Sequence, residues 1–307
     1  MADKTSAPAR VDVVVVSYCS RDTLRSCVAP LAGAPGVNVI VVDNASPDDA
    51  IATVGDLPAL RTVLAGRNGG FSSGCNLGTA AGTAPYVLLL NPDAILQPDA
   101  LGELVAMLER DDRIGLVAPK LLEPDGTVAL SQRRFPRLRS SFAQALFLHR
   151  LVPRLDEIVR EPSAYTASGA PEWVSGACML IRRSALEEIG GMDEDFFLYC
   201  EDTDVCLRLR EAGYGIRFEP SVCAKHIGGV SGPRDRLRPI LACSRVTYAR
   251  KHFRRPAAHV EAFAVALGEA VHAAVKLRRP EQVRGHLAAL RAVVAGSRPV
   301  TPAPRPT

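Results

Sequence analysis

Short runs of apolar residues alternate with helical segments over the first 120 residues, and this alternation constrains the fold most strongly. The apolar runs are Val11–Ser17, Val37–Asp43, Arg61–Ala65, Tyr86–Leu90 and Ile114–Ala118. Helical patterns fall between them, over Asp22–Leu31, Ser73–Ala81 and Pro98–Arg110. Apolar strands separated by helices are typical of a mostly parallel sheet that helices cover on both faces. The sequence therefore predicts an α/β fold.

The pattern changes after Lys120. The Arg-, Ser- and Pro-rich stretch Leu130–Ala170 predicts irregular, mobile loops. Beyond it, strands are expected over Trp173–Ile181 and Ile216–Glu219, and helices over Ser184–Ile189 and Glu201–Ala212. Two amphipathic helices are expected to close the chain, with apolar faces made of Val260, Phe263, Leu267, Val271 and Ala274 and of Val283, Leu287, Leu290 and Val294.

Composition indicates a folded protein without a membrane span. Hydrophobic residues make up 47% of the 307 residues and charged residues 23%, which is enough to build a core. Met1–Arg10 has no apolar run, so no secretory signal is expected, and prolines and glycines break the uncharged run Ser26–Val42. The eight cysteines form no C-x-x-C pair, which favours reduced thiols and a cytoplasmic location.

The charge is unevenly distributed. From Gly232 to Thr307 there are 15 Lys and Arg but 4 Asp and Glu, a net charge of +11 in a chain whose total is +4. The acidic remainder suits a metal site. The basic end, with Arg250, Lys251, Arg254 and Arg255 clustered, suits an anionic partner such as the inner face of a plasma membrane, to which we expect peripheral attachment. The other interpretation is that these cations are merely solvated.

Polar residues follow four consecutive predicted strands. They are Ser17 and Tyr18, then Asp43 and Asn44, then Asn68, Gly70 and Phe71, then Asn91 and Asp93. Ligands bind beyond the carboxyl ends of the strands in an open parallel sheet, so these residues predict a binding site, although each could be only a capped turn. A carboxylate that follows an apolar strand and a rigid proline, as Asp93 does, suits a hard cation.

An acidic cluster and a histidine complete the candidate chemistry. Glu201, Asp202 and Asp204 lie at a predicted helix start, where carboxylates stabilise the helix dipole or supply a general base of raised pKa. His226 follows a strand-like segment and suits a metal site.

The order and spacing of these motifs resemble glycosyltransferase family 2, and most closely its rhamnosyltransferase-like branch. The resemblance rests on Val13–Tyr18, Asp43–Ser46, Asn68–Phe71 with Asn76, Leu88–Asp93, Trp173–Ala177, Glu201–Asp204 and His226. It implies a GT-A fold over residues 11–232, with a nucleotide-binding half (11–120) and an acceptor or catalytic half (121–232). A flexible N-terminus (1–10), a basic helical extension (233–298) and a disordered tail (299–307) would flank it.

The resemblance also implies roles for individual residues. Ser17, Tyr18, Asp43, Asn44, Asn68, Gly70, Phe71, Asn76, Asn91 and Asp93 would bind the nucleotide-sugar. Asp93 and His226 would hold Mg²⁺ or Mn²⁺, and Trp173, Ser175, Gly176 and Asp204 would approach the acceptor. Asp202, with Glu201 beside it, would deprotonate the acceptor hydroxyl. Asn91 stands where the family's D-x-D motif begins with Asp, which removes one negative charge from the metal site.

The implied enzyme is an inverting hexosyltransferase of cell-wall or polysaccharide biosynthesis. Its acceptor would be a glycan, a lipid-linked sugar or a small molecule, and dTDP-rhamnose is the favoured donor. One alternative is a non-catalytic nucleotide-sugar or glycan-binding module. Another is a serine hydrolase, because Gly70–Gly74 matches G-x-S-x-G around Ser72. No G-x-G-x-x-G follows the first strand, and an aromatic content of 5% provides no stacking platform for nucleic acid.

Overall fold

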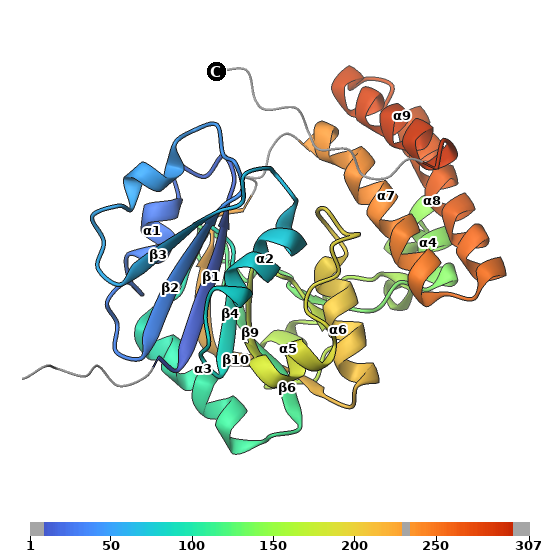
Figure 1. Ribbon diagram of the computed structural model, residues 1–307. Coiled ribbons are helices and arrows are strands. Elements are labelled where there is room, and N and C mark those ends of the chain that lie inside the picture. Colours follow the sequence, from blue (N-terminus) through green and yellow to red (C-terminus); the bar gives the residue numbers. More distant parts are fainter. Residues whose placement is uncertain (1–8, 229–233, 297–307) are drawn as a thin grey trace, which may run out of the picture.

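The computed structural model describes residues 9–228 and 234–296. It shows a sheet flanked by helices, with a group of further helices beside it (Figure 1). The predicted disordered tail, most of the predicted flexible N-terminus and the predicted boundary at residue 232 lie outside the described residues.

The central sheet has eight strands. In spatial order they are β3 (Leu60–Leu64), β2 (Val37–Asp43), β1 (Val11–Ser17), β4 (Tyr86–Leu90), β9 (Cys178–Arg182), β6 (Ile114–Leu122), β10 (Gly215–His226) and β5 (Ala94–Ile95). The first four are mutually parallel, and so are β6 and β10. This confirms the predicted α/β fold with a mostly parallel sheet. Strand β9 instead runs antiparallel to both of its neighbours.

The predicted strand over Trp173–Ile181 is in fact two strands. β8 (Trp173–Val174) pairs with β7 (Gln132–Arg133) in a separate small sheet, and β9 begins at Cys178. The residues between them, Ser175 to Ala177, turn the chain. At this break the Gly176 N–H donates to Asp202 Oδ2 at 3.1 Å and not to a neighbouring strand.

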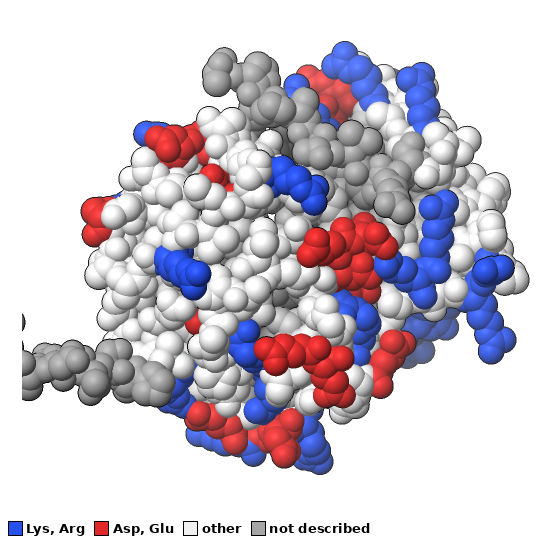
Figure 2. All heavy atoms as spheres, viewed as in Figure 1, with Lys and Arg blue, Asp and Glu red and all other residues white. Residues whose placement is uncertain are grey.

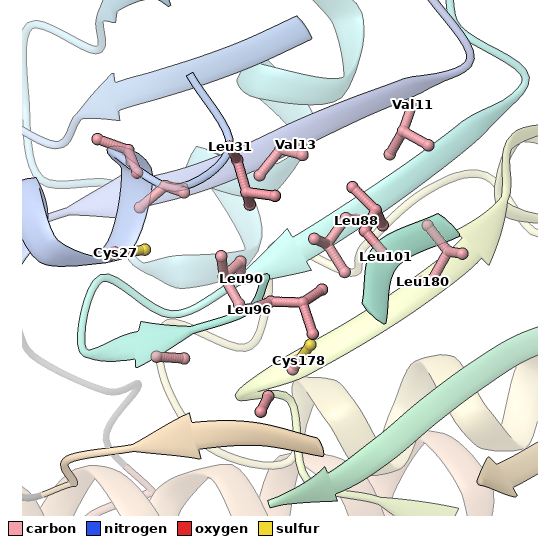
Figure 3. Close-up of a cluster of buried hydrophobic side chains, with 14 of the residues drawn as sticks. Val11, Val13, Cys27, Leu31, Leu88, Leu90, Leu96, Leu101, Cys178 and Leu180 are labelled. Atoms are coloured by element: carbon pink, nitrogen blue, oxygen red, sulfur yellow. The ribbon is translucent and has the colours of Figure 1, made fainter. Parts of the chain in front are cut away.

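Helices cover both faces of the sheet. α1 (Leu24–Val28) and α3 (Pro98–Arg110) lie on one face, and α2 (Phe71–Ala80), α5 (Arg183–Glu188) and α6 (Glu201–Glu211) on the other. Successive valines of β1 point to opposite faces of the sheet. Val13 therefore belongs to the core on the α1 and α3 face, the first core, and Val14 to the core on the other face, the second core. Figure 3 shows the first core, where Val11 and Val13 of β1 meet Leu88 and Leu90 of β4.

The segment expected to be irregular is more ordered than its composition indicates. It contains α4 (Leu138–Ala145) and, after it, the 3-10 turns η2 (Leu148–Arg150), η3 (Pro153–Leu155) and η4 (Pro162–Tyr165); another such turn, η1 (Ala50–Thr53), precedes β3. Arg245, distant in sequence, holds this segment through two hydrogen bonds of 2.7 and 2.8 Å to the Glu157 carboxylate. A long-range ion pair of this kind leaves no local signal in the sequence.

The C-terminal extension is confirmed, but it contains three described helices where two were predicted. They are α7 (Arg234–His252), α8 (Arg255–Val275) and α9 (Pro280–Val294), and they pack on one another and on α4. The two predicted apolar faces are largely exposed. Val260 and Phe263 of α8 are exposed, Phe263 to 61%, as are Leu287 and Val294 of α9.

Small residues explain why other faces of α8 and α9 are buried. A Cβ on Gly285 would lie 2.9 Å from the backbone of Asp235, so α9 approaches α7 more closely than larger side chains would allow. The buried side of α8 likewise carries Ala258, Ala264 and Ala273. Amphipathicity identified the helices, but close packing selected the faces with small residues and left larger apolar side chains outside.

Helix α8 is the one described helix that is long and apolar enough to cross a membrane by length and composition. In this structure it also carries two buried carboxylates, each in an ion pair. Glu261 accepts from Arg245 at 3.1 Å, and Glu269 accepts from Arg238 at 3.0 Å. These pairs join α8 to α7 within the extension.

A buried ion pair between Asp12 and Arg183 joins several elements of the sheet domain. Asp12 of β1 is 1% exposed, and its Oδ2 accepts hydrogen bonds from Arg183 at 2.6 Å and from the Ala84 N–H at 2.8 Å. The Asn38 amide donates to its Oδ1 at 2.8 Å. One carboxylate thus joins β1, β2, the start of β4 and α5.

We predict that Asp12→Ala lowers the free energy of unfolding by about 3–5 kcal/mol, because it leaves the Arg183 charge buried without its partner. Denaturant titration measures this change. Glu103→Ala, on the exposed side of α3, is the matched control and should stay within about 0.5 kcal/mol of the wild type. Equal effects of the two substitutions would contradict a structural role for the Asp12 pair.

Candidate active site

A cavity of about 840 Å³ lies beyond the carboxyl ends of β1, β2 and β4. Most of the predicted site residues line it: Tyr18, Asn44, Asn68, Gly70, Phe71, Asn91, Asp93, Trp173, Ser175, Gly176, Glu201, Asp202 and His226. Four predicted residues are absent from the lining, namely Ser17, Asp43, Asn76 and Asp204. The cavity therefore brings together residues more than 200 positions apart in the chain.

The side of the cavity next to β2 is held by a network of amide groups. The Asn44 Nδ2 group donates to Asn68 Oδ1 at 2.9 Å and to the Gly70 carbonyl at 3.1 Å. In return, Asn44 Oδ1 accepts from the Gly69 N–H at 3.1 Å. Asn44 is buried, so these bonds fix the loop that follows β3 against the end of β2.

Ser17 and Asp43 shape the loops behind this network. The buried Ser17 hydroxyl bonds to that of Ser20 at 2.8 Å, and Asp43 Oδ1 accepts from the Ser46 N–H at 2.9 Å. The neighbouring residues Cys19 and Ser20 line the cavity instead, which the sequence interpretation missed.

Asn76 bridges two distant segments. Its Oδ1 accepts from the Met192 N–H at 2.9 Å, while its Nδ2 donates to the Met192 carbonyl at 2.8 Å and to Glu194 at 2.9 Å. Asn76 therefore positions the loop that precedes α6. Its predicted place in the nucleotide pocket is not the place that the structure gives it.

The loop around Gly70 touches the segment leading to α6. The Phe71 N–H donates to the Phe197 carbonyl at 2.7 Å, and a Cβ on Gly70 would lie only 2.3 Å from the same oxygen. Gly70 also has a φ of 89°, in the left-handed region that favours glycine. No other residue fits there without moving one of the two segments.

The acidic cluster begins immediately after two left-handed residues. Tyr199 and Cys200 have φ angles of 70° and 67°, and this turn brings the start of α6 to the cavity. The Asp202 carboxylate accepts from the Gly176 N–H at 3.1 Å and from the Thr203 N–H at 2.8 Å. Two backbone donors on different segments therefore fix its orientation.

Burial raises the pKa of Asp202 despite these hydrogen bonds, and the positive charge of Arg133 opposes that rise. Burial also raises the pKa of Glu201, and the neighbouring charge of Asp202 raises it further. Glu201 Oε2 has no hydrogen-bond partner among the residues that the structure describes. Carboxyl groups with a raised pKa, placed on a cavity, are suited to accepting a proton.

Asp204 is buried away from the cavity. It is 0% exposed, and it accepts hydrogen bonds from Arg208 at 2.5 Å and from His252 of α7 at 2.7 Å. This position does not support the predicted contact with an acceptor. Its bond to His252 instead ties the start of α6 to the extension.

Asp93 and His226 face one another across the ends of β4 and β10. The His226 Nε2 atom lies 3.4 Å from Asp93 Oδ1, and Asp93 is buried. The Ile227 N–H donates to the Asp93 carbonyl at 2.9 Å, which holds the end of β10 next to the loop containing Asp93. No group of three or more His, Cys, Asp or Glu side chains is arranged for a metal within the described part of the chain. The pair could thus supply two ligands.

Arginines also line the cavity, and no sequence motif indicated them. Arg133 and Arg160 come from the segment that was expected to be irregular, and Arg245 comes from α7. The Arg133 guanidinium lies 5.9 Å from the centre of the Trp173 ring. The sequence did not indicate these arginines because their position at the cavity depends on how separate segments pack.

The arrangement around Ser72 excludes the hydrolase alternative. Ser72 lies inside α2, is 0% exposed and does not line the cavity. A nucleophilic serine needs an accessible hydroxyl on a sharp turn next to a base.

None of the eight cysteines, all of them in the described part of the chain, forms a disulfide.

Comparisons with known proteins agree with this geometry. The family model described as glycosyltransferase like family 2 matches residues 8–232. The N-acetylglucosaminyl-diphospho-decaprenol L-rhamnosyltransferase of Mycobacterium tuberculosis is 32% identical over 252 residues, which cover 77% of this chain and 82% of that protein. The rhamnosyltransferase WbbL of Escherichia coli is 31% identical over 144 residues, or 46% of this chain and 52% of WbbL.

Among solved structures, the fold is similar to that of the mannosyltransferase PcManGT from Pyrobaculum calidifontis, which was determined in complex with GDP-Man and Mn²⁺. The TM-score is 0.55 at 19% identity, and the match covers 95% of this chain and 89% of PcManGT. At this identity the likeness concerns the fold alone.

Proposed function

This chain belongs to the glycosyltransferase-like family 2, and we propose that it transfers a sugar from a nucleotide-diphosphate donor to an acceptor hydroxyl with inversion. It is a glycosyltransferase with a GT-A fold. One observation carries the proposed mechanism: Asp202, fixed by two backbone N–H groups, lines the same cavity as the Asp93–His226 pair.

We propose L-rhamnose as the sugar. Two relatives that are 32% and 31% identical to this chain are named rhamnosyltransferases. The motif resemblance favours dTDP as the nucleotide. The nucleotide would lie against Tyr18, Asn44 and Asn68, whose amide network provides fixed donors and acceptors on that side of the cavity.

For the acceptor we propose a lipid-linked sugar of cell-wall or polysaccharide biosynthesis. The relative from Mycobacterium tuberculosis is named for the acceptor N-acetylglucosaminyl-diphospho-decaprenol. Trp173, Ser175 and Gly176 line the cavity beside Asp202, so they are placed to contact the acceptor sugar.

The proposed reaction places the acceptor hydroxyl at Asp202. The carboxylate takes the hydroxyl proton as the oxygen forms its bond to the anomeric carbon. The bond from that carbon to the diphosphate breaks, and the nucleoside diphosphate leaves with the electron pair. Attack from the face opposite the leaving group inverts the anomeric centre, so the base and the diphosphate must occupy opposite sides of the sugar.

The residues around the leaving group fit a divalent metal. Asp93 supplies an oxygen and His226 a nitrogen, a pair of ligands that Mn²⁺ accepts and that Mg²⁺ accepts less readily. When bound, a divalent cation supplies positive charge next to the diphosphate. Asn91 also lines the cavity but contributes no charge, so we expect weaker metal affinity than two carboxylates would give.

We also propose that the protein attaches peripherally to an anionic membrane, through different residues from those that the sequence indicated. Lys251 lies 2.7 Å from both Asp193 and Asp195, so the cluster around it partly serves the catalytic domain. Exposed apolar side chains lie instead on the turns after α4, where Leu151 is 79% exposed, with Arg150 beside it. Several Lys and Arg side chains project from the side of the molecule occupied by the extension (Figure 2).

Asp202→Asn should keep donor binding and lower the rate of transfer by about 10²–10⁴, because it removes the proton acceptor. Steady-state kinetics and donor titration measure the two effects, and Asp99→Asn on exposed α3 is the control. A base works when deprotonated, so the raised pKa should place the acidic limb of the wild-type pH–rate profile above the usual aspartate range. Near wild-type turnover by Asp202→Asn would transfer the role to Glu201. If the wild type binds the donor but neither it nor any variant releases nucleotide, the protein is a non-catalytic binding module.

Asp93→Ala should strongly weaken the Mn²⁺-dependent part of donor affinity, and His226→Ala should weaken it less, because it leaves the charged ligand in place. Calorimetric titration of donor at increasing Mn²⁺ tests both variants. Asp125→Ala, on the exposed turn after β6, should behave as wild type. If neither site variant changes the metal dependence, these residues do not hold the metal.

Binding to vesicles that contain anionic lipid should appear at low salt and fade at high salt. The double substitution of Leu148 and Leu151 to Ser should reduce binding severalfold in co-sedimentation. Leu64→Ser is the control, because Leu64 is 73% exposed but lies on β3 and not on the turns after α4. An intact protein that ignores anionic vesicles at low salt would overturn the attachment and favour a water-soluble acceptor.

A further inference from the structure

The cavity extends beyond the residues assigned to donor, metal and base. Residues of α4, α7 and α8, and of the segment between α4 and β8, form its wall there, and none of them belongs to a family motif. The aliphatic part of this wall consists of Leu237, Leu241, Ala242, Ala264, Val265 and Gly268. We call this part the apolar arm. A donor placed between Asn44 and Asp93 leaves the arm without an assigned ligand.

Charged groups that border the arm neutralise one another. Arg238 donates to Glu269 at 3.0 Å, and Arg245 donates to Glu157 at 2.7 Å and to Glu261 at 3.1 Å. Arg236 also lines the cavity, and it is exposed to solvent. The arm therefore presents aliphatic surface between closed ion pairs, which suits a hydrocarbon ligand better than a sugar or a nucleotide.

Small residues let two of the helices beside the arm approach one another closely. A Cβ added to Gly268 of α8 would lie 3.3 Å from the Cβ of Ala145 of α4. Larger residues at these positions would separate the two helices. Gly268, at this contact, lines the cavity together with Leu241 of α7.

One end of the arm reaches the exposed apolar turns after α4. Gln144, His149 and His272 all line the cavity, and the Phe147 ring stacks on His272 with centroids 4.3 Å apart. Leu146 and Leu148, next to these residues in the sequence, are exposed. This end of the cavity is therefore next in the chain to the exposed turns that we propose contact a membrane.

We propose that the apolar arm binds the hydrocarbon chain of the acceptor while the sugar hydroxyl lies at Asp202. This inference rests on the proposed transfer to a lipid-linked acceptor and adds where the chain lies and which helices select it. The extension would then be part of the acceptor site, because its α7 and α8 supply all of the residues that define the arm.

The test compares two probes that share a sugar, decyl and methyl N-acetylglucosaminide, by titration calorimetry. The wild type should bind the decyl compound at least about tenfold more tightly than the methyl compound. Leu241→Gln should remove most of that difference and leave affinity for the methyl probe unchanged. Leu287→Gln, at an exposed position of α9, is the matched control and should preserve the difference.

A second variant guards against loss of folding. Leu241→Trp keeps the wall apolar but fills the arm, so it should weaken decyl binding while a butyl probe still binds better than the methyl one. Thermal unfolding of each variant is recorded alongside. Equal affinity of the wild type for decyl and methyl probes, or equal losses with Leu241→Gln and Leu287→Gln, would overturn the assignment.

These readouts are independent of turnover. A chain-dependent affinity that Leu241→Gln abolishes, together with no transfer to either probe, would uphold the arm and contradict the proposed acceptor sugar. Transfer to both probes at equal efficiency would uphold the proposed reaction and contradict the arm.

Discussion

The close contact between the backbones of Gly70 and Phe197 is the constraint on which the site depends. One segment follows β3 and carries Asn68, which is hydrogen-bonded to Asn44 at the end of β2. The other leads through two left-handed residues into the acidic helix. The 2.3 Å that would separate a Cβ at Gly70 from the Phe197 carbonyl leaves no room for any side chain. Glycine at this position thus sets how far the Asn44–Asn68 side of the cavity lies from Asp202.

Buried ion pairs attach the extension to that site. His252 of α7 binds Asp204, and Arg245 binds Glu157 and Glu261. Because each pair is buried, removing one partner would leave an unpaired charge at considerable energetic cost. The basic character of the C-terminal region therefore has two physical roles. Some cations hold the catalytic half together, and others remain exposed on the extension.

The fold was largely predictable where local patterns report burial. Val37–Asp43 and Tyr86–Leu90 are continuous apolar runs, and the structure gives strands with the same bounds. The sequence did not predict the features that depend on how distant segments pack against one another. Nothing in Cys178–Arg182 indicates that its strand runs antiparallel, and the apolar stripe of α8 did not identify its buried face because alanines pack more closely than Phe263 would.

The sequence by itself determined the family, the sheet edge at which the cavity lies and the candidates for base and metal ligands, because these depend on residue type and order along the chain. Only the tertiary structure decided which candidates reach the cavity. It placed Asp202 on the cavity and Asp204 behind it, two residues apart on one helix, because successive helical positions face different directions. It also brought α7 and α8 to the cavity wall, since long-range packing and ion pairing leave no local pattern in the sequence.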